Sequence, residues 1–118
     1  MPMFVNPQAR VPVTLGENTI YVKAKMDLGT KSAIQDEIRA KGADINEQEV
    51  RGIGSYRLLL MVHNIVAWEG PDFIDERGKA IPCTRENIKR LDPTEPLCDL
   101  VAERIGELNA APASPDPN

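Results

Sequence analysis

The chain has 118 residues, a formal net charge of −4 and 42% hydrophobic residues, of which few are aromatic. This length suits one domain with or without tails. The acidic balance argues against a nucleic-acid backbone as the main ligand, because phosphate binding requires clustered cations, whereas the Lys and Arg residues are scattered here.

The cysteine count and the apolar runs exclude several further classes. Cys83 and Cys98 are too few for a disulfide framework and are not spaced as zinc ligands. The first residues lack the basic and apolar regions of a secretory signal, and the longest apolar run is shorter than the roughly 20 residues of a membrane-spanning helix. We expect a soluble intracellular protein with free thiols and no membrane or nucleic-acid partner.

The N-terminal quarter predicts an arm and a β-hairpin. Residues 1–9 form the arm, in which Phe4 and Val5 are the residues available for packing. Residues 10–26 alternate apolar and polar positions on both sides of a turn at Gly16, which predicts the hairpin. Pro12 lacks an amide donor and is expected to put the first strand at a sheet edge. Two strands are marginally stable, so the hairpin must pack on a helix or pair with another chain.

A helix is predicted over residues 30–41, with Thr30 or Ser32 as its N-cap and Gly42 just beyond its C-terminus. Few of its residues are apolar, so we expect it to be mostly exposed. The acidic stretch that follows, up to residue 54, fits either a short strand or an irregular connection.

The densest apolar run in the chain predicts a central helix over residues 55–68, starting at Ser55 and ended by Gly70 and Pro71. A buried strand over residues 58–62 is the alternative, but the length of the run favours a helix. The apolar arc of this helix is wider than a surface helix needs, so the helix is expected to lie in a core or under a partner.

Two further helices complete the predicted domain. One covers residues 85–91 with Thr84 as its N-cap, and the other covers residues 94–108 with an apolar stripe for docking on the central helix. Residues 109–118 are rich in Ala, Pro, Ser and Asp and are expected to be disordered. The predicted fold class is α+β, with a hairpin followed by a small bundle of about four helices in one domain, residues 10–108.

No catalytic, cofactor-binding or metal-ligating constellation is predicted. His63 is the single histidine and lies among leucines, where a hydrogen-bonded core or interface role is expected, because a general base also needs an orienting partner and a nucleophile. Gly52 and Gly54 precede a helix but lack the third glycine and the Lys-Ser/Thr pair of a phosphate-binding loop. We expect a protein that is not an enzyme and needs neither a metal nor a cofactor.

Two aromatic residues, Trp68 and Phe73, flank Gly70 and Pro71 and allow two interpretations. They could close one end of the core, or they could anchor a partner, because aromatic residues are enriched in interface hot spots. Together with Leu60 and Val66 of the central helix, they are the candidate partner-binding residues.

The second half of the chain resembles a known family. The resemblance lies in Tyr-Arg-Leu-Leu-Leu at 56–60, Asn-Ile-Val-Ala-Trp-Glu-Gly-Pro-Asp-Phe at 64–73, Ile-Pro-Cys-Thr-Arg-Glu-Asn-Ile-Lys-Arg-Leu-Asp-Pro at 81–93, and a last helix with Leu97 and Ile105. This run, within residues 52–108, is similar to the small tail assembly chaperones of long-tailed bacteriophages. In that family a helix ends at Ile-Val-x-Trp, a turn leads to Val-Pro-x-Thr-x-Glu-Asn-Ile-x-x-Leu, and an amphipathic helix follows.

The resemblance implies a non-enzymatic protein of the host cytoplasm. Such a chaperone holds the long helical tape-measure protein soluble and recruits tail tube subunits, and we expect it to form homo-oligomers. The alternative is a structural virion protein, such as a connector, tail or capsid-associated component, whose N-terminal arm laces onto neighbouring subunits. A small enzyme or a nucleic-acid-binding regulator is the third interpretation. A bound metal or cofactor, or a DNA affinity that falls steeply with salt, would favour it.

Overall fold

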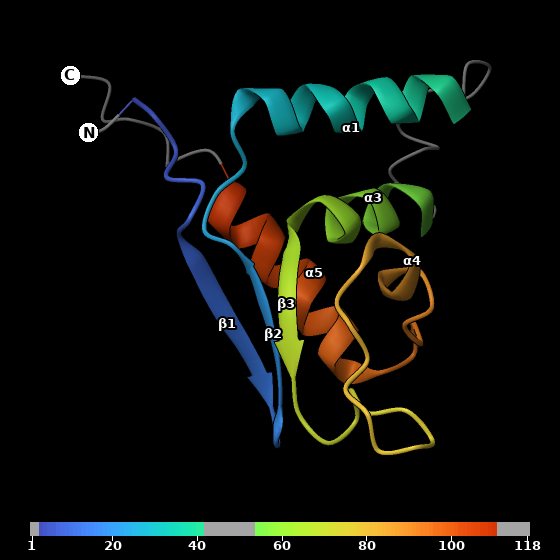
Figure 1. Ribbon diagram of the computed structural model, residues 1–118. Helices are drawn as coiled ribbons and strands as arrows, with labels where there is room; N and C mark the ends of the chain where they lie inside the picture. The colour runs from blue at the N-terminus through green and yellow to red at the C-terminus, as the bar shows by residue number, and fades with distance from the viewer. Residues whose placement is uncertain (1–2, 42–53, 111–118) are drawn as a thin grey trace.

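The architecture combines one antiparallel sheet with helices on one face and at one end (Figure 1). The computed structural model describes residues 3–41 and 54–110. Within these ranges the strands are β1 Arg10–Leu15, β2 Asn18–Lys23 and β3 Ile65–Glu69, in the order β1-β2-β3, and the helices are α1 Leu28–Lys41, α3 Gly54–Asn64, α4 Arg85–Ile88 and α5 Pro96–Asn109. The predicted α+β class, a hairpin followed by about four helices, is confirmed.

The hairpin forms where the alternation predicted it. β1 and β2 pair antiparallel from Arg10 opposite Lys23 to Leu15 opposite Asn18, which leaves a two-residue loop. Gly16 supplies the positive φ, +64°, that the first position of a tight hairpin turn requires. The apolar residues of one face are buried: Val13, Ile20 and Val22.

Pro12 lies in the edge strand, as predicted, and its register explains how the sheet tolerates it. It pairs with Tyr21, three positions back from the turn. In an antiparallel pair, hydrogen-bonded and non-hydrogen-bonded residue pairs alternate, starting with a hydrogen-bonded pair at the turn, Leu15 with Asn18. Pro12 therefore lies at a non-hydrogen-bonded position, where its backbone nitrogen faces away from β2. The missing N–H thus removes no hydrogen bond between β1 and β2. The proline interrupts the outer edge of β1 and therefore disfavours the addition of another strand there.

The predicted central helix is wrong at its C-terminal end. The helix α3 stops at Asn64, and residues 65–69 form β3, which pairs antiparallel with β2. Ile65, Val66 and Trp68 are β-branched or aromatic and fit a strand beside the unpaired side of the hairpin. Val66 is the extra residue of a bulge, because Val22 pairs with Ile65 while Tyr21 pairs with Ala67.

The helix α3 lies between two apolar clusters, and Figure 1 shows α1 lying over it. The larger cluster joins α3, α5 and the inner face of the sheet, and the smaller one joins α1 to α3 through Met26, Ile34 and Leu59. Every residue of α3 from 56 to 64 is buried or half-buried. Its wide apolar arc is therefore covered by its own chain, and a partner is not needed to explain it.

Helix ends agree with the predictions in part. Thr84 caps α4, since its hydroxyl accepts the Asn87 N–H. The helix α1 begins earlier than expected, and Asp27 Oδ1 accepts the Thr30 N–H at 2.7 Å, so neither Thr30 nor Ser32 is the cap. Ser55 lies within the first turn of α3. Gly42 with the acidic stretch to residue 53, and residues 111–118 of the predicted tail, lie outside the described residues.

Asn109 belongs to the fold and not to the tail in which it was predicted. It is the last residue of α5, and its Oδ1 accepts the Met26 N–H at 2.7 Å. Its Nδ2 donates to the carbonyl oxygen of Ile105. The side chain therefore ties the end of α5 to the segment between β2 and α1.

Gly70 sets the distance between the end of β3 and the hairpin turn. Its φ is +135°, and a Cβ placed on it would lie 2.3 Å from Asn18 Oδ1 and 2.7 Å from both Asn18 Cα and the carbonyl oxygen of Glu17. Any side chain would therefore meet backbone atoms that cannot move aside. The close approach also brings Asn18 near Asp72, two positions beyond Gly70, and Asn18 Nδ2 donates a hydrogen bond to Asp72 Oδ2 at 2.6 Å.

We expect Gly70→Ala to lower the free energy of unfolding by roughly 3 kcal/mol, because strain and backbone clash act together. Urea denaturation followed by circular dichroism measures it. Gly78→Ala is the matched control, since Gly78 has a φ of +80° and a Cβ placed on it would meet no atom within 4 Å, so that variant should lose only about 1–2 kcal/mol. Equal losses for the two variants would show that the contact with Asn18 is unimportant.

Candidate functional site

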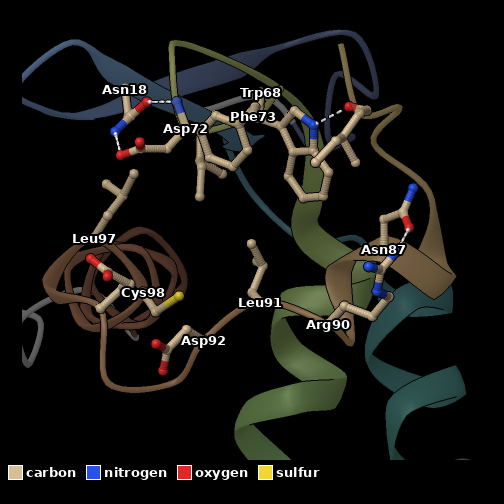
Figure 2. A pocket seen from close by; sticks show the side chains of 13 residues that line it. Asn18, Trp68, Asp72, Phe73, Asn87, Arg90, Leu91, Asp92, Leu97 and Cys98 are labelled. Carbon is tan, nitrogen blue, oxygen red and sulfur yellow. Dashed lines mark hydrogen bonds between the residues drawn. The ribbon is translucent and has the colours of Figure 1, made fainter. Parts of the chain in front are cut away.

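A cavity of about 370 Å³ opens between the hairpin turn, the loop after β3 and the segment that joins α4 to α5 (Figure 2). We call it the Trp68 pocket. Its apolar lining residues are Ile20, Trp68, Phe73, Ile81, Leu91, Leu97 and Cys98, and its polar lining residues are Asn18, Asp72, Asn87, Arg90, Asp92 and Glu95. An apolar wall with a polar rim is typical of sites that receive an apolar group.

Trp68 and Phe73, the two aromatic candidates, meet in this pocket. Their rings stack with centroids 5.0 Å apart and an interplanar angle of 11°. The Trp68 indole N–H donates to the carbonyl oxygen of Ile81 at 2.6 Å, which fixes the ring beside the cavity. Phe73 is buried in the main core, while Trp68 is half-buried. The pair thus closes one end of the core and at the same time forms a wall of the pocket.

The other two candidates, Leu60 and Val66, do not line the pocket. Leu60 is half-buried and packs against both apolar clusters. Val66 is 36% exposed in the bulge of β3, because residues 65–69 leave the helix and join the sheet. Leu60 and Val66 were both predicted in the central helix, but only Leu60 lies in α3, whereas Val66 lies in β3.

The rim of the pocket is acidic. Three carboxylates line it, from Asp72, Asp92 and Glu95, against one guanidinium, from Arg90. Hydrogen bonds from the side chain and the backbone N–H of Thr94 lower the pKa of Asp92, so this carboxylate stays ionised well into acid. The rim therefore favours a cationic group beside the apolar one.

The one thiol in the wall of the pocket, that of Cys98, is shielded from solvent. Cys98 is buried, and desolvation raises the pKa of its thiol. The reactive form of cysteine is the thiolate, which this environment disfavours. The thiol therefore contributes to the apolar wall of the pocket rather than acting as a nucleophile.

Sequence reasoning missed most of the pocket. Leu91 and Leu97 lie in the two helices predicted over residues 85–91 and 94–108, and Asn18 lies just after the predicted turn at Gly16, but none of the three was predicted as a site residue. The contact between Asn18 and Asp72 joins residues 54 positions apart and depends on the close approach at Gly70. Such a contact leaves no periodic signal in the sequence. The aromatic pair could be found because aromatic residues are few in this chain and these two are close in sequence.

His63 has the hydrogen-bonded role that was predicted, in an ion cluster away from the pocket. Its Nε2 lies 2.8 Å from Glu37 Oε1, and Arg85 donates to Glu37 Oε2, also at 2.8 Å. The carboxylate of Glu37 thus joins α1 to α3 and α4. The hydrogen bond from His63, followed by the charge and hydrogen bond of Arg85, lowers the pKa of Glu37.

The described part of the chain contains neither a cluster suited to a metal ion nor a helix suited to span a membrane. In residues 3–41 and 54–110, His, Cys, Asp and Glu side chains do not gather in threes or more as a metal ion would need. Within the same ranges no helix has both the length and the apolar character that crossing a bilayer requires. Comparisons with protein-family models, with curated proteins and with solved structures find no match for this chain.

The Glu37 cluster predicts a pH-dependent part of the stability. Because the folded-state pKa of Glu37 lies below its ordinary value of 4.5, its contribution is present above about pH 4.5 and is lost as the pH falls through the folded-state pKa. We expect Glu37→Gln to be less stable than the native chain at pH 7 and the difference to shrink below pH 4.5. Urea midpoints across this range measure it.

Glu103→Gln, at an exposed position on α5, is the control for the Glu37→Gln comparison. The same acid-sensitive difference in both variants would mean that the cluster between α1, α3 and α4 has no special role. A difference for Glu37→Gln that stays constant with pH would contradict the lowered pKa.

Proposed function

We propose that this protein is a tail assembly chaperone of a long-tailed bacteriophage, which keeps the tape-measure protein soluble and recruits tail tube subunits. One observation carries the proposal: the segments that resemble this family, residues 64–73 and 81–93, supply most of the Trp68 pocket. Trp68, Phe73, Ile81 and Leu91 are all in these segments and all line the cavity. The resemblance and the pocket thus point to the same residues.

The chemistry of the pocket supports this role. A chaperone for a long helical client must hold apolar side chains that would otherwise aggregate, without sealing them permanently. The Trp68 pocket offers an apolar wall of aromatic and aliphatic groups, and its rim remains exposed and charged. An apolar residue on one face of a client helix can enter such a site while the polar face stays in water.

The alternative is a structural component that remains in the virion. The observation that favours it is the exposed N-terminal arm, in which Met3 and Phe4 are each 90% exposed, as an arm laced onto neighbouring subunits would be before assembly. Mass spectrometry of purified particles separates the two functions, since a chaperone should be scarce in the finished particle and a structural component stoichiometric.

The test is co-expression with the tape-measure protein of the same phage. We expect the native chain to raise the soluble fraction of the client, and Leu91→Asp to weaken client binding by about tenfold or more, because a buried carboxylate opposes apolar contact. Trp68 is the only tryptophan, so a titration with a client fragment that lacks tryptophan should change its fluorescence.

Leu28→Asp is the control, because Leu28 is 82% exposed and lies outside the pocket. Circular dichroism must show that both variants are folded. The proposal fails if the native chain neither keeps the tape-measure protein soluble nor responds in Trp68 fluorescence. It also fails if Leu28→Asp impairs binding as much as Leu91→Asp does.

A further inference from the structure

The N-terminal arm is attached to the hairpin by backbone hydrogen bonds, and its apolar residues Met3 and Phe4 are exposed. The Ala9 N–H donates to the carbonyl oxygen of Asn6 at 3.2 Å and the Gln8 N–H donates to Asn6 Oδ1 at 2.9 Å, which makes a turn. The Ala24 N–H then bonds the carbonyl oxygen of Ala9 at 3.0 Å and ties this turn to the hairpin. Beyond the turn, Met3 and Phe4 are each 90% exposed.

The arm cannot place Phe4 in the Trp68 pocket of its own chain while this turn is formed. The arm leaves β1 at Arg10, whereas the pocket lies at the opposite end of the hairpin, beside Asn18. The two ends are about 17 Å apart along the strands, at about 3.4 Å per residue, and the pocket begins at β2, one strand spacing of about 5 Å further across the sheet. The turn at residues 6–9 leaves only two residues of extended reach to Phe4, about 7 Å.

The charges at the two ends of the hairpin are complementary. The base of the arm carries Arg10, Lys23 and Lys25, with Asp27 as the nearby acidic residue. The rim of the pocket carries Asp72, Asp92 and Glu95 against Arg90. An arm that enters the pocket of another molecule would thus bring its cationic base to an acidic rim.

We propose that the occupant of the Trp68 pocket in the isolated protein is the arm of a second copy of this chain, with Phe4 inserted against Trp68 and Leu91. The cavity of about 370 Å³ is within the range of pockets that enclose small ligands, about 300–1,000 Å³, and so has room for the ring. Each chain contributes one arm and one pocket, so two copies can exchange arms reciprocally or several can join head to tail.

The proposed contact between the arm and the pocket of a second copy goes beyond the proposed chaperone function. Only its competition with a client rests on that function. If a client side chain enters the same pocket, client binding and arm exchange exclude each other, and the arm shields the apolar wall until a client displaces it. The self-association itself needs no client and can be tested without one.

The experiment is light scattering coupled to size-exclusion chromatography over a wide range of concentration. We expect the native chain to associate, Phe4→Ser to weaken association by at least about tenfold because the burial of one aromatic side chain is lost, and Glu95→Lys to weaken it at low salt only. Leu100→Ser, at an exposed apolar position on α5, is the control and should associate as the native chain does.

A cross-link places the arm in the pocket directly. Cys98 itself is buried, so the cross-link uses Arg90, an exposed residue of the rim. When a Met3→Cys chain, which keeps Phe4, is mixed with an Arg90→Cys chain, each also carrying Cys83→Ser and Cys98→Ser, the two should form a disulfide while diamide accepts the two electrons and two protons. Glu103→Cys, at an exposed position outside the pocket, should give much less of this product in place of Arg90→Cys. Circular dichroism must show that each variant is folded.

A chain that stays monomeric at every concentration and gives no cross-link would overturn the proposal. So would oligomers that persist in Phe4→Ser, or a cross-link to Glu103→Cys as abundant as the one to Arg90→Cys. Client solubilisation by Phe4→Ser separates this inference from the chaperone function: if that variant is monomeric and still holds the client, both proposals stand, and if the native chain is monomeric and holds the client, the arm exchange alone fails.

Discussion

The pairing of β2 with β3 is the constraint on which the rest of this structure depends. It brings residues 65–69 beside the hairpin and ends with Gly70 against the backbone of Glu17 and Asn18. That close approach lets Asn18 bond Asp72, and the loop that follows turns back so that the Ile81 N–H donates to the carbonyl oxygen of Phe73. Phe73 and Ile81 of this loop line the Trp68 pocket. The pairing of β3 with β2 therefore positions both the third strand and the pocket.

The helices contribute to this arrangement unequally. The helix α5 packs on β1, β2 and α3 and supplies fully buried Val101 and Ile105 to the main core. By contrast, α1 packs on α3 through a small apolar cluster and through the contacts of Glu37 with His63 and Arg85. The sheet and α5 thus share the main apolar core, whereas α1 is held by a smaller apolar cluster together with polar contacts.

The wide apolar arc of the central helix suggested that this helix could lie under a partner, but in the structure its own chain covers it. The helix α3 is covered by α1, α5 and the sheet, and the Trp68 pocket and the arm offer open apolar surface, besides separate exposed residues such as Leu28. A protein that acts through other proteins needs such surface, and here it is divided between a concave site and a projecting one. Under the two proposals made above, a client and a second copy of the chain would use the same cavity in turn.

The sequence by itself determined the elements whose signals are local. The hairpin followed from period-two alternation around Gly16, the edge position of β1 from Pro12, the cap at Thr84 from its side-chain oxygen, and the aromatic pair from its rarity in the chain. Each depends on residues within a few positions of one another, and so each can be read without the fold.

Only the tertiary structure decided where the central helix ends and which residues form the site. Residues 65–68 continue an apolar run, and a helix and a strand are both compatible with them locally. The open side of β2 selected the strand, through hydrogen bonds that span more than 40 positions. The pocket likewise combines the hairpin turn, the loop after β3 and the segment between α4 and α5. Contacts at such separations are set by the packing of the whole chain, which is why no pattern in the sequence revealed them.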